Sequence, residues 1–324
     1  MNKNNLLVTA VDDNYINMAK QFFASAYFNS GFKGDYMLLA HNISEENLYW
    51  FREKGILIKN CQPLISSMPQ KWPPVVLDKF YLFSPEFKKW ENIIYLDSDM
   101  IIKASLNDLI NTKEFASLNI DQFFKKTKLK KYFNKSSQCF DQELFDKIKN
   151  EYDLNSIGFS GGVFAFNTKI IEDDLFLKIK KLIPILKFSN WGEEIILNLI
   201  FNNKWQKLPM IYNLNPIVIR NICGIKLKNQ RGIIFHYDKK EKLSEDDPFY
   251  QERKINEIRA EKIDLNDRPR AKERWNNKMI YTYQLYLYFR HIIYVPYYQI
   301  NGLIGRVGKY ISKNHQGLYL KLKK

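Results

Sequence analysis

Short apolar runs separated by amphipathic segments fill the first hundred residues of the chain. Four of these runs predict buried strands, at residues 6–11, 36–40, 56–58 and 93–96. Three segments between them predict helices, at residues 14–29, at 45–54 and from 77 to 83. Because strands alternate with helices, the pattern predicts an α/β fold in which a mainly parallel sheet carries helices on both faces.

The pattern beyond residue 100 predicts three more strands and a further helix. The strands lie at residues 115–120, 163–167 and 233–235, and the helix lies at residues 193–202. A lysine-rich stretch, residues 125–135, is interpreted as a long surface loop. We therefore expect one α/β domain over residues 1–250, followed by a basic, largely helical extension over residues 251–324.

Polar clusters follow two of the predicted strands. Residues 12–15 follow the first strand, and residues 97–99 follow the fourth. In parallel sheets, ligands bind beyond the carboxyl ends of the strands. The two clusters therefore indicate a shared nucleotide site at one edge of the sheet.

The positive charge of the chain is concentrated at its C-terminal end. The 324 residues carry a formal net charge of +15, and residues 268–324 hold twelve Lys or Arg against one acid, Glu273. This excess favours acidic partners, namely sugar nucleotides, anionic lipid surfaces or nucleic acid. No recognition module for nucleic acid is visible in the sequence, so nucleic acid is not the partner we expect.

The cysteines and the apolar runs indicate a cytoplasmic protein. Cys61, Cys139 and Cys223 lie far apart and form no CxxC pair, which argues against a disulfide framework and against a zinc site. The N-terminal apolar run is too short for a signal peptide, and no run is long enough to span a bilayer. We expect a protein that is soluble or peripheral on the inner face of the membrane.

Asp97 and Asp99 have a spacing that suits a divalent metal. Two carboxylates at i and i+2, just past a buried strand, can converge on one cation. Without a cation, the carboxylates would repel the negative charge of a diphosphate. Two like unit charges about 4 Å apart repel each other by about 4 kcal/mol at an effective dielectric near 20. A divalent cation reverses that sign and acts as a Lewis acid for the leaving group. The alternative is a solvated turn, because this pattern is common.

The segment around these aspartates, DKFYLFSPEFKKWENIIYLDSDMIIKASLNDLI, resembles glycosyltransferase family 8, which has the GT-A fold. Four other segments resemble the remaining signatures of that family in the expected order, over roughly residues 5–245. The resemblance implies a Rossmann-like sheet and the metal-dependent transfer of a hexose from a UDP-sugar, with retention of anomeric configuration. It implies a hydroxyl acceptor on a glycan or a lipid-linked molecule, and a role in polysaccharide biosynthesis.

The resemblance assigns donor contacts to two segments near the N-terminus. VTAVDDNY, at residues 8–15, resembles the first strand and uridine pocket of the family, which makes Asp12, Asn14 and Tyr15 contacts to base and ribose. Lys79 stands at the position of the family's basic donor contact. The structural alternatives are acids favoured at a helix N-terminus and a lysine on a helix surface.

The resemblance completes the metal site with a histidine. IFHY resembles the family's histidine segment, which makes His236 the third ligand beside the two aspartates, and Lys242 would neutralise the diphosphate. Two carboxylates, an imidazole and two phosphate oxygens suit Mn²⁺ better than Mg²⁺, which is the alternative ion. The chain departs from the family pattern nearby, where Lys239 replaces a Gly and Leu243-Ser244 replaces Pro-Trp.

A glycine pair supplies further predicted donor contacts. FSGGV resembles the family's F-N-x-G-V, in which Gly161 and Gly162 let the backbone approach the donor sugar closely. Ser160 replaces the usual Asn of that segment, so the hydrogen bond made there must differ. Ser98, between the two aspartates, is a further predicted donor contact.

Two adjacent acids are the catalytic candidates. GEEIILN resembles the acidic helix start of the family and places Glu193 on its first acid and Glu194 opposite the anomeric carbon. Glu194 would stabilise an oxocarbenium-like centre or act as a covalent nucleophile. The alternative is local, because acids stabilise the N-terminus of a helix without any catalytic role.

The C-terminal tail mixes basic residues with aromatic ones, which suits an amphipathic segment in an anionic membrane interface. Its alternative roles are a homo-oligomer interface or a helical cap on the domain.

Two other functions of the whole protein also stay open. One is an inverting GT-A transferase that uses Glu193 or Glu194 as general base, and the other is a non-catalytic membrane-binding or assembly protein.

Overall fold

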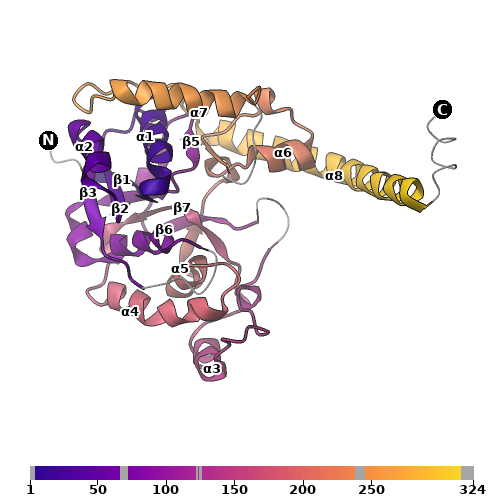
Figure 1. The fold of residues 1–324 in the computed structure, drawn as a ribbon, viewed down its shortest axis with the longest axis horizontal. Coiled ribbons are helices and arrows are strands. Elements are labelled where there is room, and N and C mark those ends of the chain that lie inside the picture. Colours follow the sequence, from indigo (N-terminus) through magenta and orange to yellow (C-terminus); the bar gives the residue numbers. More distant parts are fainter. Residues whose placement is uncertain (1–3, 66–71, 122, 124–125, 238–244, 315–324) are drawn as a thin grey trace.

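The computed structural model describes residues 4–65, 72–121, 123, 126–237 and 245–314, with side chains given as far as Pro296. Within these ranges, seven strands form a central sheet in the order β3-β2-β1-β4-β7-β6-β8 (Figure 1). They are β1 (Asn5–Asp12), β2 (Asp35–His41), β3 (Leu57–Cys61), β4 (Asn92–Leu96), β6 (Phe115–Asn119), β7 (Phe159–Asn167) and β8 (Trp205–Lys207).

One strand of this sheet runs against the others. β1 pairs in parallel with β2 and β4, and β2 pairs in parallel with β3. β7 pairs antiparallel with β4 and β6, whereas β8 pairs in parallel with β6. The sheet is therefore mainly parallel, as the sequence predicted. Because β7 is reversed, its first residues lie at the same edge of the sheet as the carboxyl ends of β1 and β4.

The α-helices of the described residues alternate with these strands through most of the chain. They are α1 (Ile16–Ser30), α2 (Glu45–Glu53), α3 (Gln142–Glu151), α4 (Leu175–Leu182), α5 (Glu194–Ile200), α6 (Pro216–Cys223), α7 (Pro248–Arg259) and α8 (Asn277–Asn314). Side-chain oxygens cap several of their N-termini, with Asp141 before α3, Asn215 before α6 and Asp247 before α7. Each cap satisfies a backbone N–H of the first turn that has no partner within the helix.

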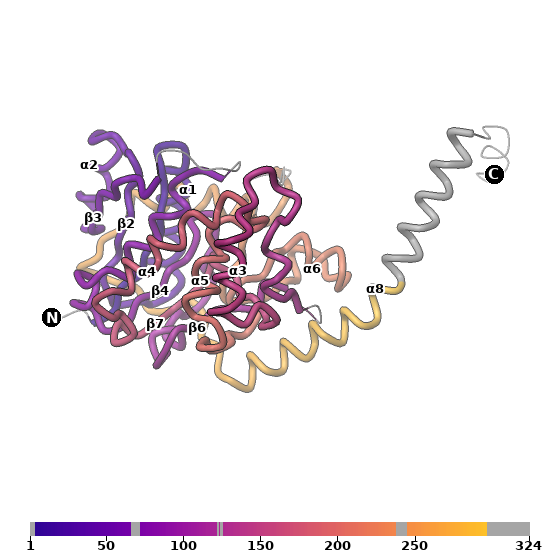
Figure 2. The backbone as a smooth tube through the Cα atoms, turned by 90° about the horizontal axis from the view of Figure 1, so that it is seen from below, coloured from indigo at the N-terminus to yellow at the C-terminus, as the bar shows by residue number. Residues whose placement is uncertain are grey.

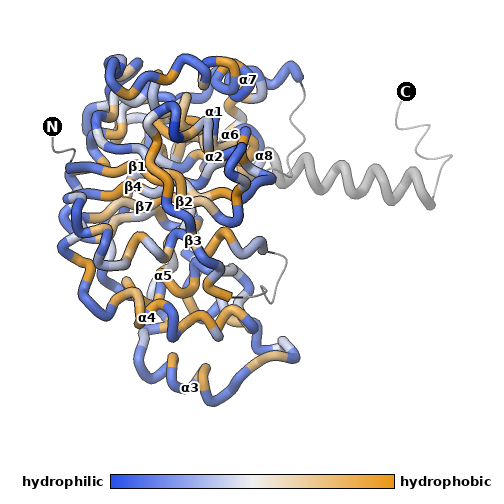
Figure 3. The backbone as a smooth tube through the Cα atoms, turned by 60° about the vertical axis from the view of Figure 1, so that its left-hand side comes forward, coloured by the Kyte–Doolittle hydropathy of each residue, from blue (hydrophilic) through white to orange (hydrophobic). Residues whose placement is uncertain are grey.

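Helices cover both faces of the sheet because its central strands are apolar on both sides (Figure 3). Leu6 and Val8 of β1 face a cluster that includes α3, α4, α5 and the 3₁₀ helix Pro74–Phe83. Leu7 and Val11 face the opposite cluster, which includes α1, α2 and the residues that follow α7. The sheet is thus the middle layer of three.

A second, two-stranded sheet joins distant parts of the chain. β5 (Met100–Ile102) pairs antiparallel with β9 (Ile234–His236), and Met100 lies opposite His236. The strand predicted at residues 233–235 therefore forms outside the central sheet. This pairing brings His236 beside the turn that follows β4.

Two predicted segments differ from the expectation. The segment expected to be helical from residue 77 is the 3₁₀ helix Pro74–Phe83 and not an α-helix. Most of its side chains are buried, on all of its sides, so tertiary packing decides its conformation. The lysine-rich stretch is more than a surface loop, because Leu129 and Tyr132 are buried in a short 3₁₀ helix, Leu129–Tyr132. Apolar residues between the lysines anchor it to the core.

The C-terminal extension packs on the domain before it leaves the body of the molecule (Figure 2). Ala260, Ile263 and Trp275 belong to the hydrophobic cluster of α1 and β1. Ile280 and Leu287 of α8 are also buried. Among the helices that the structure describes, none combines the length and apolar character that a membrane span requires. The division of the chain at residue 250 stays a prediction.

Candidate functional site

A cavity of about 630 Å³ lies at the edge of the sheet where β1 and β4 end and β7 begins. Its volume is in the range of small-molecule binding sites. Most of the predicted site residues line it: Tyr15, Lys79, Asp97, Ser98, Asp99, Gly162, Glu193, Glu194 and His236. The structure therefore brings residues from six separate segments of the chain to one place.

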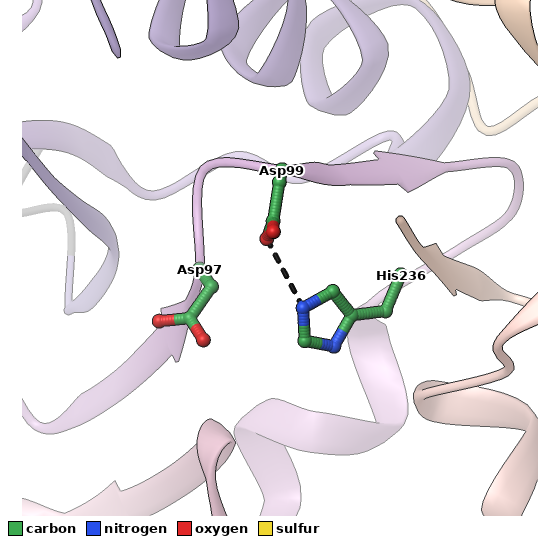
Figure 4. A group of neighbouring side chains, drawn as sticks. All are labelled: Asp97, Asp99 and His236. Atoms are coloured by element: carbon green, nitrogen blue, oxygen red, sulfur yellow. Dashed lines mark ion pairs between the residues drawn. The ribbon is translucent and has the colours of Figure 1, made fainter. Parts of the chain in front are cut away.

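Three side chains suited to metal binding meet at one wall of the cavity (Figure 4). Asp97, Asp99 and His236 each offer one ligand atom, and these atoms all lie within 4.8 Å of one another. His236 Nε2 lies 3.1 Å from Asp99 Oδ1. The pairing of β5 with β9 sets this approach, because Asp99 precedes β5 and His236 ends β9. Two carboxylates and one imidazole fit Mn²⁺ or a related divalent cation.

Asn213 orients the imidazole of His236 from the far side. His236 Nδ1 lies 3.0 Å from Asn213 Oδ1. A carboxamide oxygen only accepts hydrogen bonds, so Nδ1 carries a proton, and Nε2 on the other side of the ring faces Asp99 and is the atom that would bind a metal. Sequence reasoning missed Asn213, which lies in the loop before α6 and belongs to no motif.

Lys79 is buried beneath the aspartates and does not lie on a helix surface. Its side chain is 2% exposed, and Nζ donates to Glu193 Oε1 at 2.8 Å and to the Gly161 carbonyl at 3.0 Å. Nζ also lies 3.5 Å from Asp97 Oδ1. Burial alone would lower the pKa of Lys79, but the charges of Asp97 and Glu193 outweigh burial and hold the pKa well above its usual value. Lys79 is therefore a buried cation shared by two carboxylates.

Contacts from β4 itself and from the neighbouring strand β7 hold Asp97 in place. The Tyr95 hydroxyl donates to Asp97 Oδ1 at 2.9 Å, and Asp97 N donates to the Gly162 carbonyl at 2.9 Å. A Cβ at Gly162 would lie only 2.6 Å from Asp97 Oδ2. A glycine is needed there because any side chain would displace the carboxylate.

The two adjacent glutamates have different surroundings. Glu193 pairs with Lys79, whereas Glu194 Oε1 accepts a hydrogen bond from Gly161 N at 3.0 Å. Glu194 Oε2 is buried and accepts no hydrogen bond from the described residues. Burial, followed by the negative charge of Glu193, raises the pKa of Glu194 to about 8. A cavity-lining carboxyl group that titrates near neutral pH is a candidate for a chemical role.

The loop after β1 contributes less to the cavity than the sequence predicted. Tyr15 lines the cavity, whereas Asp12 and Asn14 lie outside its lining. Asp12 Oδ1 accepts a hydrogen bond from Asn14 N at 2.9 Å, and Asp13 Oδ1 accepts one from Asn47 Nδ2 at 3.0 Å. These bonds cap the turn and tie it to α2. A contact between Asp12 or Asn14 and a nucleoside stays a prediction.

The remaining predicted residues are placed as follows. The Gly161 carbonyl accepts a hydrogen bond from Lys79 Nζ, and Gly161 N donates one to Glu194 Oε1. Lys242 lies outside the described residues. Sequence reasoning missed Trp72 and Trp191, which line the cavity beside the predicted residues. The signal for Trp191 was its place three residues before Glu194.

Comparisons with known proteins bear on the family. A model of the family described as glycosyl transferase family 8 matches residues 6–243. Two curated relatives are galactinol synthase 1 of Ajuga reptans, 22% identical over 180 residues, and galactinol synthase 4 of Arabidopsis thaliana, 22% identical over 188 residues. Each match covers 53% of this chain and 53% of the relative, so the chain spans about half the length of these curated relatives.

Solved structures bear on the fold. The bifunctional glycosyltransferase WbbM matches with a TM-score of 0.55 and 17% identity, over 82% of this chain and 52% of that chain. The galactosyltransferase LgtC, solved with donor and acceptor sugar analogues, matches with a TM-score of 0.55 and 16% identity, over 78% of this chain and 94% of that chain. At these identities the likeness shows a shared GT-A fold and nothing about substrates.

Proposed function

The chain belongs to glycosyltransferase family 8, and from that premise we propose that it transfers a hexose from a UDP-sugar to a hydroxyl group with retention of anomeric configuration. One observation carries the proposal. The side chains of Asp97, Asp99 and His236 gather on the wall of a cavity that is also lined by Glu194. A metal site and a separate carboxyl group on one cavity suit a sugar that is activated by a diphosphate.

The proposed cofactor is a divalent cation, Mn²⁺ in preference to Mg²⁺, held by Asp97, Asp99 and His236 Nε2. Such a cation supplies Lewis-acid stabilisation of the leaving diphosphate. The protein itself fixes the spacing and the orientation of these three metal-binding side chains. Lys79 contributes by its charge, since an array of carboxylates without a counter-cation would repel both each other and the diphosphate.

The remaining donor contacts are proposed from the family resemblance and from their place at the edge of the sheet. They are Asp12, Asn14 and Tyr15 for the base and ribose, Lys79, Ser98, Gly161 and Gly162 for the sugar and phosphates, and Lys242 for the diphosphate. Tyr15, Lys79, Ser98 and Gly162 support this assignment by lining the cavity.

Glu194 is proposed to face the anomeric carbon, with Glu193 as its charged neighbour. As a carboxylate, Oε2 would stabilise the positive charge that develops at that carbon when the bond to the diphosphate breaks, or would attack it as a nucleophile. The stabilising role gives retention when the acceptor hydroxyl attacks from the face that the diphosphate leaves, and the nucleophilic role gives retention through two successive inversions. NMR of the anomeric proton of the product distinguishes retention from inversion, and a β-linked product from an α-linked donor would contradict the proposal.

The proposed acceptor is a glycan or a lipid-linked molecule in polysaccharide biosynthesis. We propose that residues 1–250 form the transferase domain and that residues 251–324 attach it to an anionic membrane surface on the cytoplasmic side. The positive charge of residues 268–324 supports this role. Contact between copies of the chain through the same extension is the competing role.

Measuring how far UDP binding depends on Mn²⁺ tests the proposed function. We expect Asp99→Ala to abolish the Mn²⁺-dependent binding of UDP, as measured by calorimetry, because the variant removes one of three ligands. Asp173→Ala is the matched control, since Asp173 lies on the surface with a side chain that is 94% exposed. Unchanged affinity for UDP in Asp99→Ala with Mn²⁺ present would contradict the metal site.

A further inference from the structure

Two tryptophans stand exposed at the cavity that holds the candidate site. Trp72 is 46% exposed and Trp191 is 41% exposed, and both line the cavity with Glu194. Indole rings bury much of their surface in most proteins, so two exposed rings at one cavity mark a binding surface. Neither ring has a part in the metal site or in the buried network around Lys79.

Each tryptophan contacts a neighbouring residue on one side and stays partly exposed. Trp72 lies against Gly192, where a Cβ would stand 3.4 Å from the indole atoms Cδ1 and Nε1. Gly192 has a φ of +58°, a backbone conformation that favours glycine. Trp191 packs on the Tyr132 ring, with the ring centroids 5.5 Å apart. The two rings are thereby oriented before any ligand arrives, which lowers the entropic cost of binding.

The cavity that the two tryptophans line carries both apolar side chains and carboxyl groups. Pro73, Val75, Val76 and Ile120 also line the cavity. Carboxyl groups of the same lining, Glu194 among them, supply acceptors of hydrogen bonds. A ligand that satisfies this site has a flat apolar face and hydroxyl groups around its edge.

We infer that Trp72 and Trp191 bind the acceptor, and that the part of the acceptor they bind is a pyranose ring. A pyranose presents axial C–H groups on its face, which stack on an aromatic ring, and hydroxyl groups on its rim, which donate to carboxylates. An acyl chain lacks the hydroxyl groups, and a serine or glycerol hydroxyl lacks the apolar face. The inference deepens the proposed function and rests on it, since it narrows the acceptor class to glycans.

Saturation-transfer NMR on the intact chain tests this inference directly. The probes are lactose, maltose and cellobiose, each measured with and without UDP and Mn²⁺, with glycerol as the hydroxyl compound that lacks a ring. We expect saturation of the ring C–H protons of at least one disaccharide and none of glycerol. Calorimetry of UDP with Mn²⁺ on the same samples reports the donor site separately.

Substitutions assign the binding to the two rings. We expect Trp72→Ala and Trp191→Ala each to weaken saccharide binding by roughly tenfold and to leave UDP binding unchanged, since stacking on an aromatic face is lost and the metal site is not. Trp72→Phe and Trp191→Phe keep an aromatic face and should restore most of the binding. Tyr49→Ala removes an aromatic side chain that is 60% exposed on α2, away from the cavity, and should change nothing.

The outcomes separate the two proposals. Equal saccharide binding in the Trp→Ala variants and the unaltered chain would overturn the inference, as would a chain that binds UDP with Mn²⁺ but none of the disaccharides. The second result leaves the proposed function intact. A chain that binds disaccharides through both tryptophans but never binds UDP would support the sugar site and contradict the proposed function.

Discussion

Glu193 and Glu194 are identical in type and adjacent in sequence, and their surroundings give them different properties. Lys79 Nζ lies 2.8 Å from Glu193 Oε1 and forms an ion pair with it. Glu194 has a backbone N–H on one oxygen and no partner among the described residues on the other, so burial raises its pKa to about 8. Two acids with such different surroundings are suited to different chemical roles.

The first prediction uses this electrostatic coupling. If Glu194 acts as a carboxylate, turnover should rise with pH as Glu194 ionises. Glu193→Gln removes a negative charge that raises the pKa of Glu194, so that pKa should fall and the acid limb of the pH profile should shift to lower pH. The pH dependence of kcat/KM for hydrolysis of a UDP-sugar measures the shift. Glu193→Asp keeps the charge and should show little shift, and an unmoved acid limb in Glu193→Gln would reject the coupling.

The second prediction concerns the residue behind the metal site. Asn213→Ala removes the acceptor of the His236 Nδ1 hydrogen bond, so the ring is free to turn and to change tautomer. We expect Mn²⁺ affinity, measured by titration in the presence of UDP, to fall about 10- to 100-fold, the usual effect of losing such a partner. Asn213→Asp keeps an acceptor at this place and should retain most of the affinity. Equal affinity in all three proteins would show that Asn213 has no orienting role.

At the scale of elements, the reversed strand β7 explains why the site could be predicted only in part. The apolar run at residues 163–167 predicted a strand, but Gly161 and Gly162 before it are weak strand formers, so the start of β7 at Phe159 was missed. The strand direction was also not readable, because a continuous apolar run is typical of parallel strands, yet β7 pairs antiparallel with both of its neighbours. That direction places the two glycines beside Asp97 and Glu194.

The sequence predicted the site residues that belong to local motifs and missed those that only long-range pairing brings to the site. Asp97, Asp99 and His236 belong to motifs with characteristic residue types, and the structure places them together. Asn213 and Trp72 act through position alone. Asn213 meets His236 because Leu214 pairs with β9, where His236 N donates to the Leu214 carbonyl. Such long-range pairing leaves no local pattern in a single sequence.

The third prediction tests the two close approaches of β7. A Cβ at Gly162 would lie 2.6 Å from Asp97 Oδ2, whereas a Cβ at Gly161 would lie 3.0 Å from Glu194 Cγ. Gly162→Ala should therefore displace a metal ligand and weaken Mn²⁺ binding roughly tenfold or more. Gly161→Ala should lower turnover and leave Mn²⁺ binding nearly unchanged. Mn²⁺ titration and donor hydrolysis measured on both variants check this division, and the same loss in both variants would contradict it.

At the scale of the whole molecule, α8 has two faces with different partners. Ile280 and Leu287 are buried against the domain, and Arg290 Nε donates to the Cys223 carbonyl at 3.0 Å. The other face is apolar and exposed, at a spacing of one helical turn: Tyr281 is 65% exposed, Leu285 49%, Phe289 62%, Ile292 59% and Ile293 56%. Exposed apolar side chains in register, beside a basic tail, suit the interface of an anionic bilayer.

The last prediction tests this face against the competing role. Replacing Leu285, Phe289 and Ile292 with Ser removes apolar surface that would enter the bilayer, so we expect binding to vesicles containing phosphatidylserine to weaken by roughly tenfold or more in cosedimentation. Binding by the unaltered chain should also fall with added salt, since each basic residue near an anionic surface contributes about 1 kcal/mol.

The matched control for that experiment replaces Ile255 and Ile258 of α7, which are 47% and 73% exposed, with Ser. This control removes apolar surface elsewhere on the molecule and should leave vesicle binding unchanged. Light scattering on the same proteins addresses contact between copies of the chain. If the unaltered chain ignores the vesicles and forms a dimer that the triple variant loses, the exposed face of α8 joins two copies and does not bind a membrane. Since Ile280 and Leu287 remain in every variant, the packed half of α8 is preserved, and a difference between variants reports on the exposed face alone.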